Sequence, residues 1–224
     1  MNYKDYVYFD IETAGNYPDL RALCDNNTRA CELFTQKCKN KHWEGDPYDI
    51  YIQKAGLLPE FGKIICVSIA TIKQDDTMKM ISYYSDNELD ILRNVQKIFN
   101  TVSTKTLLGL CGFFIKGFDI PWLNRKMLKY DMEIPKILKT FNVKPWEMNV
   151  LDLSELWKNS GSLENVSFDE MLYSLDIDSP KNEMSGKDVH NNYWNFNNLD
   201  KIKDYCENDV KACIEAAKKI CPLL

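Results

Sequence analysis

The sequence lacks the features that would place it in a membrane or divide it into parts. No apolar run approaches the roughly 20 residues that a membrane-spanning helix needs. The first residues, Met1-Asn2-Tyr3-Lys4-Asp5, do not resemble a signal peptide. There is no internal repeat, no low-complexity tract and no linker that would justify a second domain. We therefore expect a single cytoplasmic domain that covers residues 1–224.

The chain also lacks an excess of basic residues. Its net charge is −5 and its pI is about 5.2, which argues against a protein that coats nucleic acid through a broad basic surface. An enzyme that holds only a few terminal nucleotides is still compatible with this charge, and its binding should weaken as salt rises. The 45% hydrophobic and 12% aromatic content is typical of a globular domain with a sizeable core.

The eight cysteines do not indicate a disulfide scaffold. Cys66 and Cys111 lie in apolar runs typical of strands, and an intracellular chain would keep such thiols reduced. The candidates for a zinc site share one stretch of the chain and are Cys24, Cys31, Cys38 and His42. These cysteines recur every seven residues, whereas structural zinc ligands usually have shorter spacing and seven is also the period of one helix face. We therefore expect free thiols on the inner face of a helix.

The apolar pattern predicts both strands and helices. The segments with strand character are residues 6–13, 63–72, 78–84, 106–111 and 149–153. Helical spacing predicts a helix from its cap at Asp86 to about Asn100, and a last helix that is capped by Asp200 and ends before Pro222. Residues 16–53 contain no strand pattern, so we interpret them as a largely helical insertion after the first strand. The pattern indicates an α/β chain and leaves its topology open.

Four acidic residues in three separate segments are the clearest functional feature of the chain. Asp10 and Glu12 are two residues apart in the first predicted strand, so both side chains point to the same face. Asp119 falls at a predicted helix start, where the helix dipole and free N–H groups help hold a carboxylate. Asp209 follows Tyr205 by four residues, on one face of the last helix. Carboxylates crowded in this way need cations, and hard divalent ions prefer oxygen ligands.

The motifs around these residues resemble a known family. The order Asp-x-Glu, Phe-Asp and Tyr-x-x-x-Asp is that of the DEDD 3′ to 5′ exonucleases with tyrosine in the third motif. Further matching segments are Leu58-Pro59-Glu60-Phe61-Gly62-Lys63-Ile64, Lys144-Pro145-Trp146-Glu147, Leu151-Asp152-Leu153-Ser154-Glu155-Leu156-Trp157, and Ser179-Pro180-Lys181 running on to Val189-His190-x-x-Tyr193-Trp194. The chain thus resembles DnaQ-like stand-alone exonucleases related to the proofreading domain of family-B DNA polymerases. The resemblance covers nearly the whole chain and is weak only between Gly15 and Gln53. The resemblance implies a ribonuclease H-like fold, with a central mixed five-stranded sheet flanked by helices.

The resemblance also implies a role for each acidic residue. Asp10 would bridge two ions of Mg²⁺ or Mn²⁺, and Glu12 and Asp209 would complete the site that activates water. Asp119 would hold the second ion, largely through water. Tyr205 would orient the attacking water with its hydroxyl.

His190 is not expected to be a general base. In the histidine subgroup of this family the base lies five residues before the last aspartate, and that position here is Asp204.

Less specific matches to the family motifs imply which residues contact the substrate. Lys181 would lie near the scissile phosphate and Ser167 near the single strand, and Phe118 would also bind the substrate. Phe114 departs from the family pattern because it replaces an asparagine that contacts the terminal nucleotides in polymerase relatives. Phe114 is therefore either a core residue or a ring that stacks on a base, which tolerates any sequence.

The sequence therefore predicts a metal-dependent 3′ to 5′ exonuclease that releases nucleoside 5′-monophosphates from single-stranded DNA ends. An exonuclease that prefers RNA is one alternative, because no side chain is identified that would meet the 2′-hydroxyl. A binding module that has kept the fold and lost turnover is the other. Since no polymerase domain is recognised, proofreading would require a polymerase or repair partner in trans.

Overall fold

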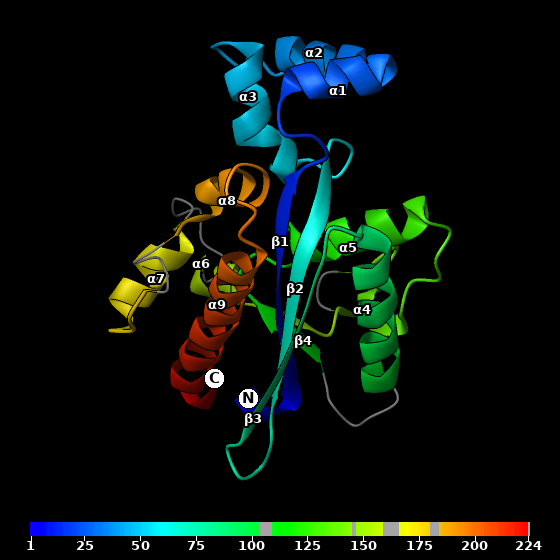
Figure 1. Cartoon of the computed structure of the whole chain (residues 1–224). Helices are drawn as coiled ribbons and strands as arrows, with labels where there is room; N and C mark the ends of the chain where they lie inside the picture. Colours follow the sequence, from blue (N-terminus) through cyan, green and yellow to red (C-terminus); the bar gives the residue numbers. More distant parts are fainter. Residues whose placement is uncertain (104–108, 145–146, 159–165, 180–183, 224) are drawn as a thin grey trace.

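A mixed five-stranded sheet forms the centre of the molecule (Figure 1). The computed structural model describes residues 1–103, 109–144, 147–158, 166–179 and 184–223. The strand order is β3-β2-β1-β4-β5. The strands are β1 (Tyr6–Gly15), β2 (Gly62–Ile72), β3 (Met78–Tyr84), β4 (Gly109–Gly112) and β5 (Val150–Asp152). The five predicted strands are thus confirmed, except that residues 106–108 of the fourth lie outside the described residues.

Neighbouring strands are antiparallel in one half of the sheet and parallel in the other half. β1 pairs with β2 in the antiparallel sense and β2 with β3 likewise, whereas β1 with β4 and β4 with β5 are parallel. A register shift between Glu12 and Thr13 marks a bulge in the β1–β2 ladder, and such bulges re-aim neighbouring side chains. β1 is the central strand, so its backbone is hydrogen-bonded to a neighbouring strand on each side.

Helices cover both faces of the sheet. They are α1 (Leu20–Asn26), α2 (Thr28–Asn40), α3 (Pro47–Lys54), α4 (Glu88–Ser103), α5 (Asp119–Lys129), α6 (Leu153–Lys158), α7 (Phe168–Ser174), α8 (Val189–Trp194) and α9 (Leu199–Ile220). Short 3₁₀ turns are η1 (Tyr3–Asp5), η2 (Ala55–Leu57), η3 (Lys136–Leu138), η6 (Gly186–Asp188) and η7 (Cys221–Leu223). In the part of the chain that the structure describes, no helix is both long and apolar enough to span a membrane.

The alternation of β1 separates two cores. Phe9 and Ile11 are buried on one face, among residues of α4 and α5. Tyr8 is buried on the other face, among residues of α7 and α9. Successive strand residues point to opposite faces, so Asp10 shares the α9 face with Tyr8. The sheet therefore presents acidic side chains of its central strand to its longest helix.

The predicted helix caps were wrong by one or two residues. Asn87, not Asp86, caps α4, since its side chain accepts a hydrogen bond from the backbone N–H two residues on at 3.1 Å. Asp86 instead accepts a hydrogen bond from the Tyr193 hydroxyl at 2.7 Å. Asn198, not Asp200, caps α9 by accepting a backbone N–H three residues on at 3.2 Å. In both places an asparagine lies within two residues of the aspartate, and asparagine is an equally good cap.

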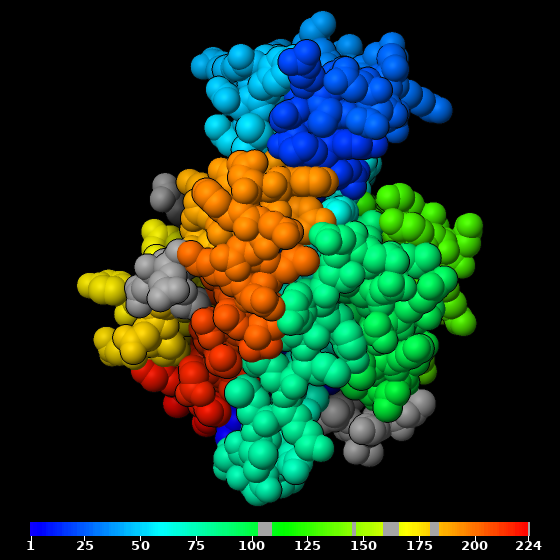
Figure 2. All heavy atoms as spheres, in the orientation of Figure 1, coloured from blue at the N-terminus to red at the C-terminus, as the bar shows by residue number. Residues whose placement is uncertain are grey.

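The predicted insertion is helical, as expected. Helices α1 to α3 form a lobe that projects beyond one end of the sheet (Figures 1 and 2). The lobe has an apolar core of its own, made of Leu20, Leu23, Phe34, Cys38, Ile50, Tyr51, Ala55 and Phe61. Phe34 packs edge-on against Tyr51 and Phe61, with ring centroids 5.1 Å apart in both pairs. These contacts fix α3 against the start of β2.

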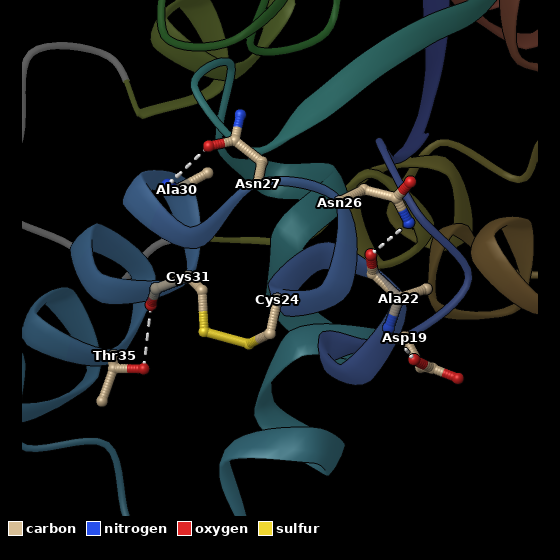
Figure 3. Close-up of a disulfide and its surroundings, with 8 residues drawn as sticks. All are labelled: Asp19, Ala22, Cys24, Asn26, Asn27, Ala30, Cys31 and Thr35. Carbon is tan, nitrogen blue, oxygen red and sulfur yellow. Dashed lines mark hydrogen bonds between the residues drawn. A yellow bond between two sulfur atoms is a disulfide. The ribbon is translucent and has the colours of Figure 1, made fainter.

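The prediction of three reduced thiols on one helix face was wrong. Cys24 and Cys31 form a disulfide between α1 and α2 (Figure 3). Asn27 is the reason, because it ends α1 and then caps α2 by accepting the backbone N–H of Ala30 at 3.0 Å. The chain turns at this residue, so the two cysteines face each other instead of following one helix. Cys38 remains a buried free thiol, as predicted.

Candidate active site

The central strand and the last helix bring three carboxylates together. Asp10 and Glu12 come from β1, and Asp209 comes from the buried face of α9. One oxygen of each carboxylate lies within 4.8 Å of the others. Cys206, one turn before Asp209, helps to hold the helix against the strand because its thiol donates a hydrogen bond to the backbone carbonyl of Asp10 at 3.4 Å.

Asp119 reaches the same place from the opposite face of the sheet. It is the first residue of α5 and is 3% exposed. Its Oδ1 accepts a hydrogen bond from the backbone N–H of Ile11 at 3.1 Å, between the two acidic residues of β1. Asp119 and Asp10 line one cleft, although Asp119 is not within the close carboxylate group. The predicted helix-start position of Asp119 is confirmed.

Burial makes ionisation of these groups unfavourable. Burial first, and then the neighbouring carboxylates, raise the pKa of Asp10 and of Glu12 well above their ordinary values. Burial raises the pKa of Asp119 to about 7, against partial compensation by the backbone N–H groups that it accepts. The group therefore resists full negative charge until a cation neutralises it.

The donor set fits hard divalent cations. All the candidate ligands are carboxylate oxygens, the type that Mg²⁺ and Mn²⁺ prefer. Asp10 Oδ2 is buried and has no hydrogen-bond donor among the described residues, an arrangement that costs free energy unless something binds the oxygen. Asp10, Glu12 and Asp209 are therefore the residues that would hold a cation, and Asp119 lines the same cleft as Asp10.

Tyr205 lies next to the carboxylates rather than simply in the core. It is four residues before Asp209 on α9, so both side chains share a helix face. Burial, followed by the charge of Asp209, raises the pKa of its phenol. Tyr205 thus places a protonated hydroxyl beside the acidic group.

A cleft opens beside the acidic group. It has a volume of about 410 Å³ and contains Asp10 and Asp119 at its base. Its other lining residues are Ile11, Phe113, Phe114, Phe118, Ser154, Lys158 and Val166. A second cleft, of about 180 Å³, shares Ile11 and Phe118 with the first and extends past Glu12 to Gln53 of the insertion. Phe118 thus lines both clefts, and its contact with a substrate stays a prediction.

Phe114 is not a core residue, so that alternative was wrong. It is 49% exposed and lines the cleft with Asp10 and Asp119. Its backbone has φ 59°, a left-handed conformation that is uncommon for a large residue. The apolar run around Phe114 gave no sign of this turn.

The remaining sequence candidates have mixed outcomes. Ser167 caps α7 and exchanges hydrogen bonds with Glu170, so its hydroxyl is engaged in a capping box. Lys181 lies outside the described residues.

His190 accepts the backbone N–H of Gly15 at Nδ1 (3.1 Å) and its Nε2 is 2.8 Å from the carbonyl oxygen of Pro18. The histidine therefore links α8 to the end of β1, consistent with its exclusion as a base.

Asp204 does not take the place of a base either. It is exposed on the outer face of α9 and its carboxylate lies 2.7 Å from the Nζ of Lys203. The structure brings Tyr205 to the acidic group instead.

Sequence reasoning missed two features of the site. Asp152, at the end of β5, is buried and organises the loop that precedes Asp119. Lys158 lines the cleft at the end of α6. Asp152 lies in a segment that resembles the family, and its place at the end of a short strand was a further signal, because neighbouring parallel strands end at the same edge of a sheet.

Comparison with known proteins gives a family and a fold. Residues 57–213 match the model of a family described as predicted 3′–5′ exonucleases related to the exonuclease domain of PolB. No curated protein matches the chain. The family B DNA polymerase of the hyperthermophilic archaeon Pyrobaculum calidifontis is similar in structure, with a TM-score of 0.60 and 13% identity. The similarity covers 97% of this chain and 24% of the polymerase chain.

These two matches agree with the geometry. The structural match confirms the ribonuclease H-like fold, with its mixed sheet flanked by helices. The family match begins after the insertion, so Asp10 and Glu12 lie outside it, while Asp119, Tyr205 and Asp209 lie inside. The matched residues make up well over half of the chain, and the chain therefore belongs to the family of predicted 3′–5′ exonucleases related to the exonuclease domain of PolB.

Proposed function

We propose that this protein is a metal-dependent 3′ to 5′ exonuclease of the tyrosine subgroup, acting on the 3′ ends of single-stranded DNA. The observation that carries the proposal is the group formed by Asp10, Glu12 and Asp209, whose oxygens lie within 4.8 Å of one another in a buried site. A bound cation would offset the repulsion among these carboxylates. Family membership supplies the class of reaction.

Each residue of the group has a separate part in this proposal. Two bound divalent cations would activate a water molecule and stabilise the leaving oxygen of the phosphodiester. Glu12 and Asp209 would hold one cation near Tyr205, and Asp119 would hold the second. Asp10 would serve both cations, because it belongs to the close group and also lines the cleft with Asp119.

Tyr205 positions the nucleophile in this proposal. Its phenol stays protonated at neutral pH because burial and Asp209 raise its pKa. The hydroxyl therefore acts as a hydrogen-bonding group and not as a base. Correct placement of a nucleophile contributes to the rate without changing how tightly the cations are held.

The two clefts support a single-stranded substrate. The first cleft has aromatic rings on its walls, including Phe114, and ring stacking holds bases without regard to sequence. The second cleft continues past Phe118, so a strand whose end lies at Asp10 has room for its next nucleotide. With a net charge of −5, recognition of a few terminal nucleotides is more compatible with the chain than coating of a long strand.

A substrate panel tests the proposal. Oligonucleotides of one sequence, as single-stranded DNA, duplex DNA and RNA, are incubated with Mg²⁺, Mn²⁺ or EDTA. A 5′ label should report stepwise shortening of the single-stranded DNA and a 3′ label should appear first as a mononucleotide. Faster loss of RNA would replace the DNA assignment, and no hydrolysis of any substrate would refute the enzyme assignment.

A matched pair of variants distinguishes an effect on the carboxylate site from an effect on helix α9, which carries it. Asp209→Asn should remove activity, whereas Asp204→Asn changes the same residue type on the exposed face of α9 and should leave activity unchanged. Equal activity of the two variants would contradict the proposed metal site.

A further inference from the structure

Asp152 is a buried carboxylate that serves a loop rather than a cation. It ends β5 and is 3% exposed. Its Oδ1 accepts hydrogen bonds from the backbone N–H of Phe114 at 2.9 Å and from the hydroxyl of Ser154 at 2.7 Å. Its Oδ2 accepts the backbone N–H of Lys116 at 2.9 Å. This one side chain therefore fixes two alternate residues of the loop between β4 and α5.

The loop needs such an anchor because its backbone is unusual at Phe114. A left-handed conformation is unfavourable for a large residue and persists only where the surroundings hold it. Phe114 adopts φ 59°, and its carbonyl accepts hydrogen bonds from the N–H groups of Gly117 and Phe118, both at 3.0 Å. The N–H of the same residue is held by Asp152. Phe114 is therefore fixed through both of its backbone polar groups.

Gly117 fixes the ring as well as the backbone. A Cβ atom at Gly117 would lie only 2.3 Å from Cζ of Phe114 and 2.5 Å from its Cε2. Real carbon atoms do not approach so closely, so the ring occupies the space that the glycine leaves. The ring thus lies over Gly117 while it remains 49% exposed to the cleft.

We propose that Asp152 and Gly117 are positioning residues that hold the Phe114 ring in the cleft as a preformed platform for the base of the 3′-terminal nucleotide. The inference rests on the proposed function, since it concerns how the same cleft holds its substrate. Asp152 is not among the residues that line the cleft, so it acts through Phe114. A ring that is already in place loses little freedom when a base stacks on it, which favours binding.

The experiment compares two single-stranded DNA oligonucleotides that differ only at the 3′ end. One ends in an ordinary nucleotide and the other in an abasic residue. Loss of the terminal base should raise the KM of the parent enzyme by about 5- to 150-fold, the range expected for one stacked base. Phe114→Ala, Gly117→Ala and Asp152→Asn should each raise KM for the ordinary oligonucleotide towards the abasic value, with kcat changed by less than a few fold.

A double variant shows whether Asp152 acts through the ring. Asp152→Asn combined with Phe114→Ala should have the KM of Phe114→Ala alone, because the ring that Asp152 positions is already absent. Additive effects, or equal losses on ordinary and abasic ends, would overturn the proposal. If Asp152→Asn does not fold, Asp152→Glu, which displaces the carboxylate by one methylene group, is measured in its place with the same expectation.

Controls keep this inference separate from the proposed function. Glu155→Gln removes the exposed partner of Lys116 in the same loop, 2.6 Å from its Nζ, and should leave the ratio of the two KM values unchanged. If the parent cleaves neither oligonucleotide, the enzyme assignment fails. Equilibrium binding of the same two oligonucleotides then still tests the platform, and equal affinities would refute it.

Discussion

The pH dependence of the metal-free protein is a direct consequence of the buried carboxylates. Burial raises the pKa of Asp119 from an ordinary value of 3.8 to about 7. The folded protein therefore retains a proton that the unfolded chain loses between about pH 4 and pH 7, and stability falls as pH rises through that window. At about 1.4 kcal/mol for each pKa unit, Asp119 alone accounts for roughly 4 kcal/mol. Asp10 and Glu12 act in the same direction.

Urea unfolding at several pH values in EDTA measures this effect, with Asp119→Asn as the control that does not titrate. The difference in unfolding free energy between the parent and the control should decrease by roughly 4 kcal/mol from pH 4 to pH 8. Saturating Mg²⁺ should restore stability above pH 7, because a cation binds the ionised carboxylates of the folded state only. A difference that stays flat or rises with pH would refute the assigned burial and electrostatics of Asp119.

Three further predictions concern single features. Tyr205→Phe should lower kcat by roughly ten- to a thousandfold with little change in Mg²⁺ affinity, as assays over a range of Mg²⁺ would show; undiminished turnover would make Tyr205 a packing residue. Lys126→Met should lower the free energy of unfolding in urea, by less than the roughly 3 to 5 kcal/mol of a wholly unpaired buried charge, because the buried Glu88 loses the cation 3.4 Å away and keeps Lys129 at 3.8 Å; an unchanged midpoint would exclude the Lys126–Glu88 pair as a stabilising contact. Reduction of the Cys24–Cys31 disulfide should lower the unfolding free energy by roughly 2 kcal/mol, as expected for a short closed loop, and an unfolding curve insensitive to reductant would contradict it.

The orientation of the acidic residues was predictable because it depends on local periodicity, while the resemblance to a family implied that the three segments meet. Asp10 and Glu12 lie two apart on a strand, and Tyr205 and Asp209 lie four apart on a helix, so strand and helix geometry alone orient each pair. Asp119 at a helix start follows the same logic. The predicted strand at residues 78–84 also matches β3 to the residue.

Other features depend on contacts between distant residues, which periodicity does not report. The backbone of Phe114 is set by Asp152, 38 positions further along the chain, so an apolar run gave no hint of an exposed ring. The disulfide depends on a turn at Asn27, whose capping ability competes with a pattern that otherwise continues as one helix. Both features follow from tertiary packing or from a single cap rather than from the hydrophobic pattern.

The central claim is that Asp10 lies at the metal site of a nuclease, and one comparison tests it most directly. Parent and Asp10→Ala proteins are assayed side by side for mononucleotide release from single-stranded DNA in Mg²⁺, and their melting temperatures are measured in EDTA. The variant should be inactive yet folded, and its metal-free form should melt higher than the metal-free parent because a repelled buried carboxylate has been removed. Unchanged turnover in Asp10→Ala would contradict the assignment of this site.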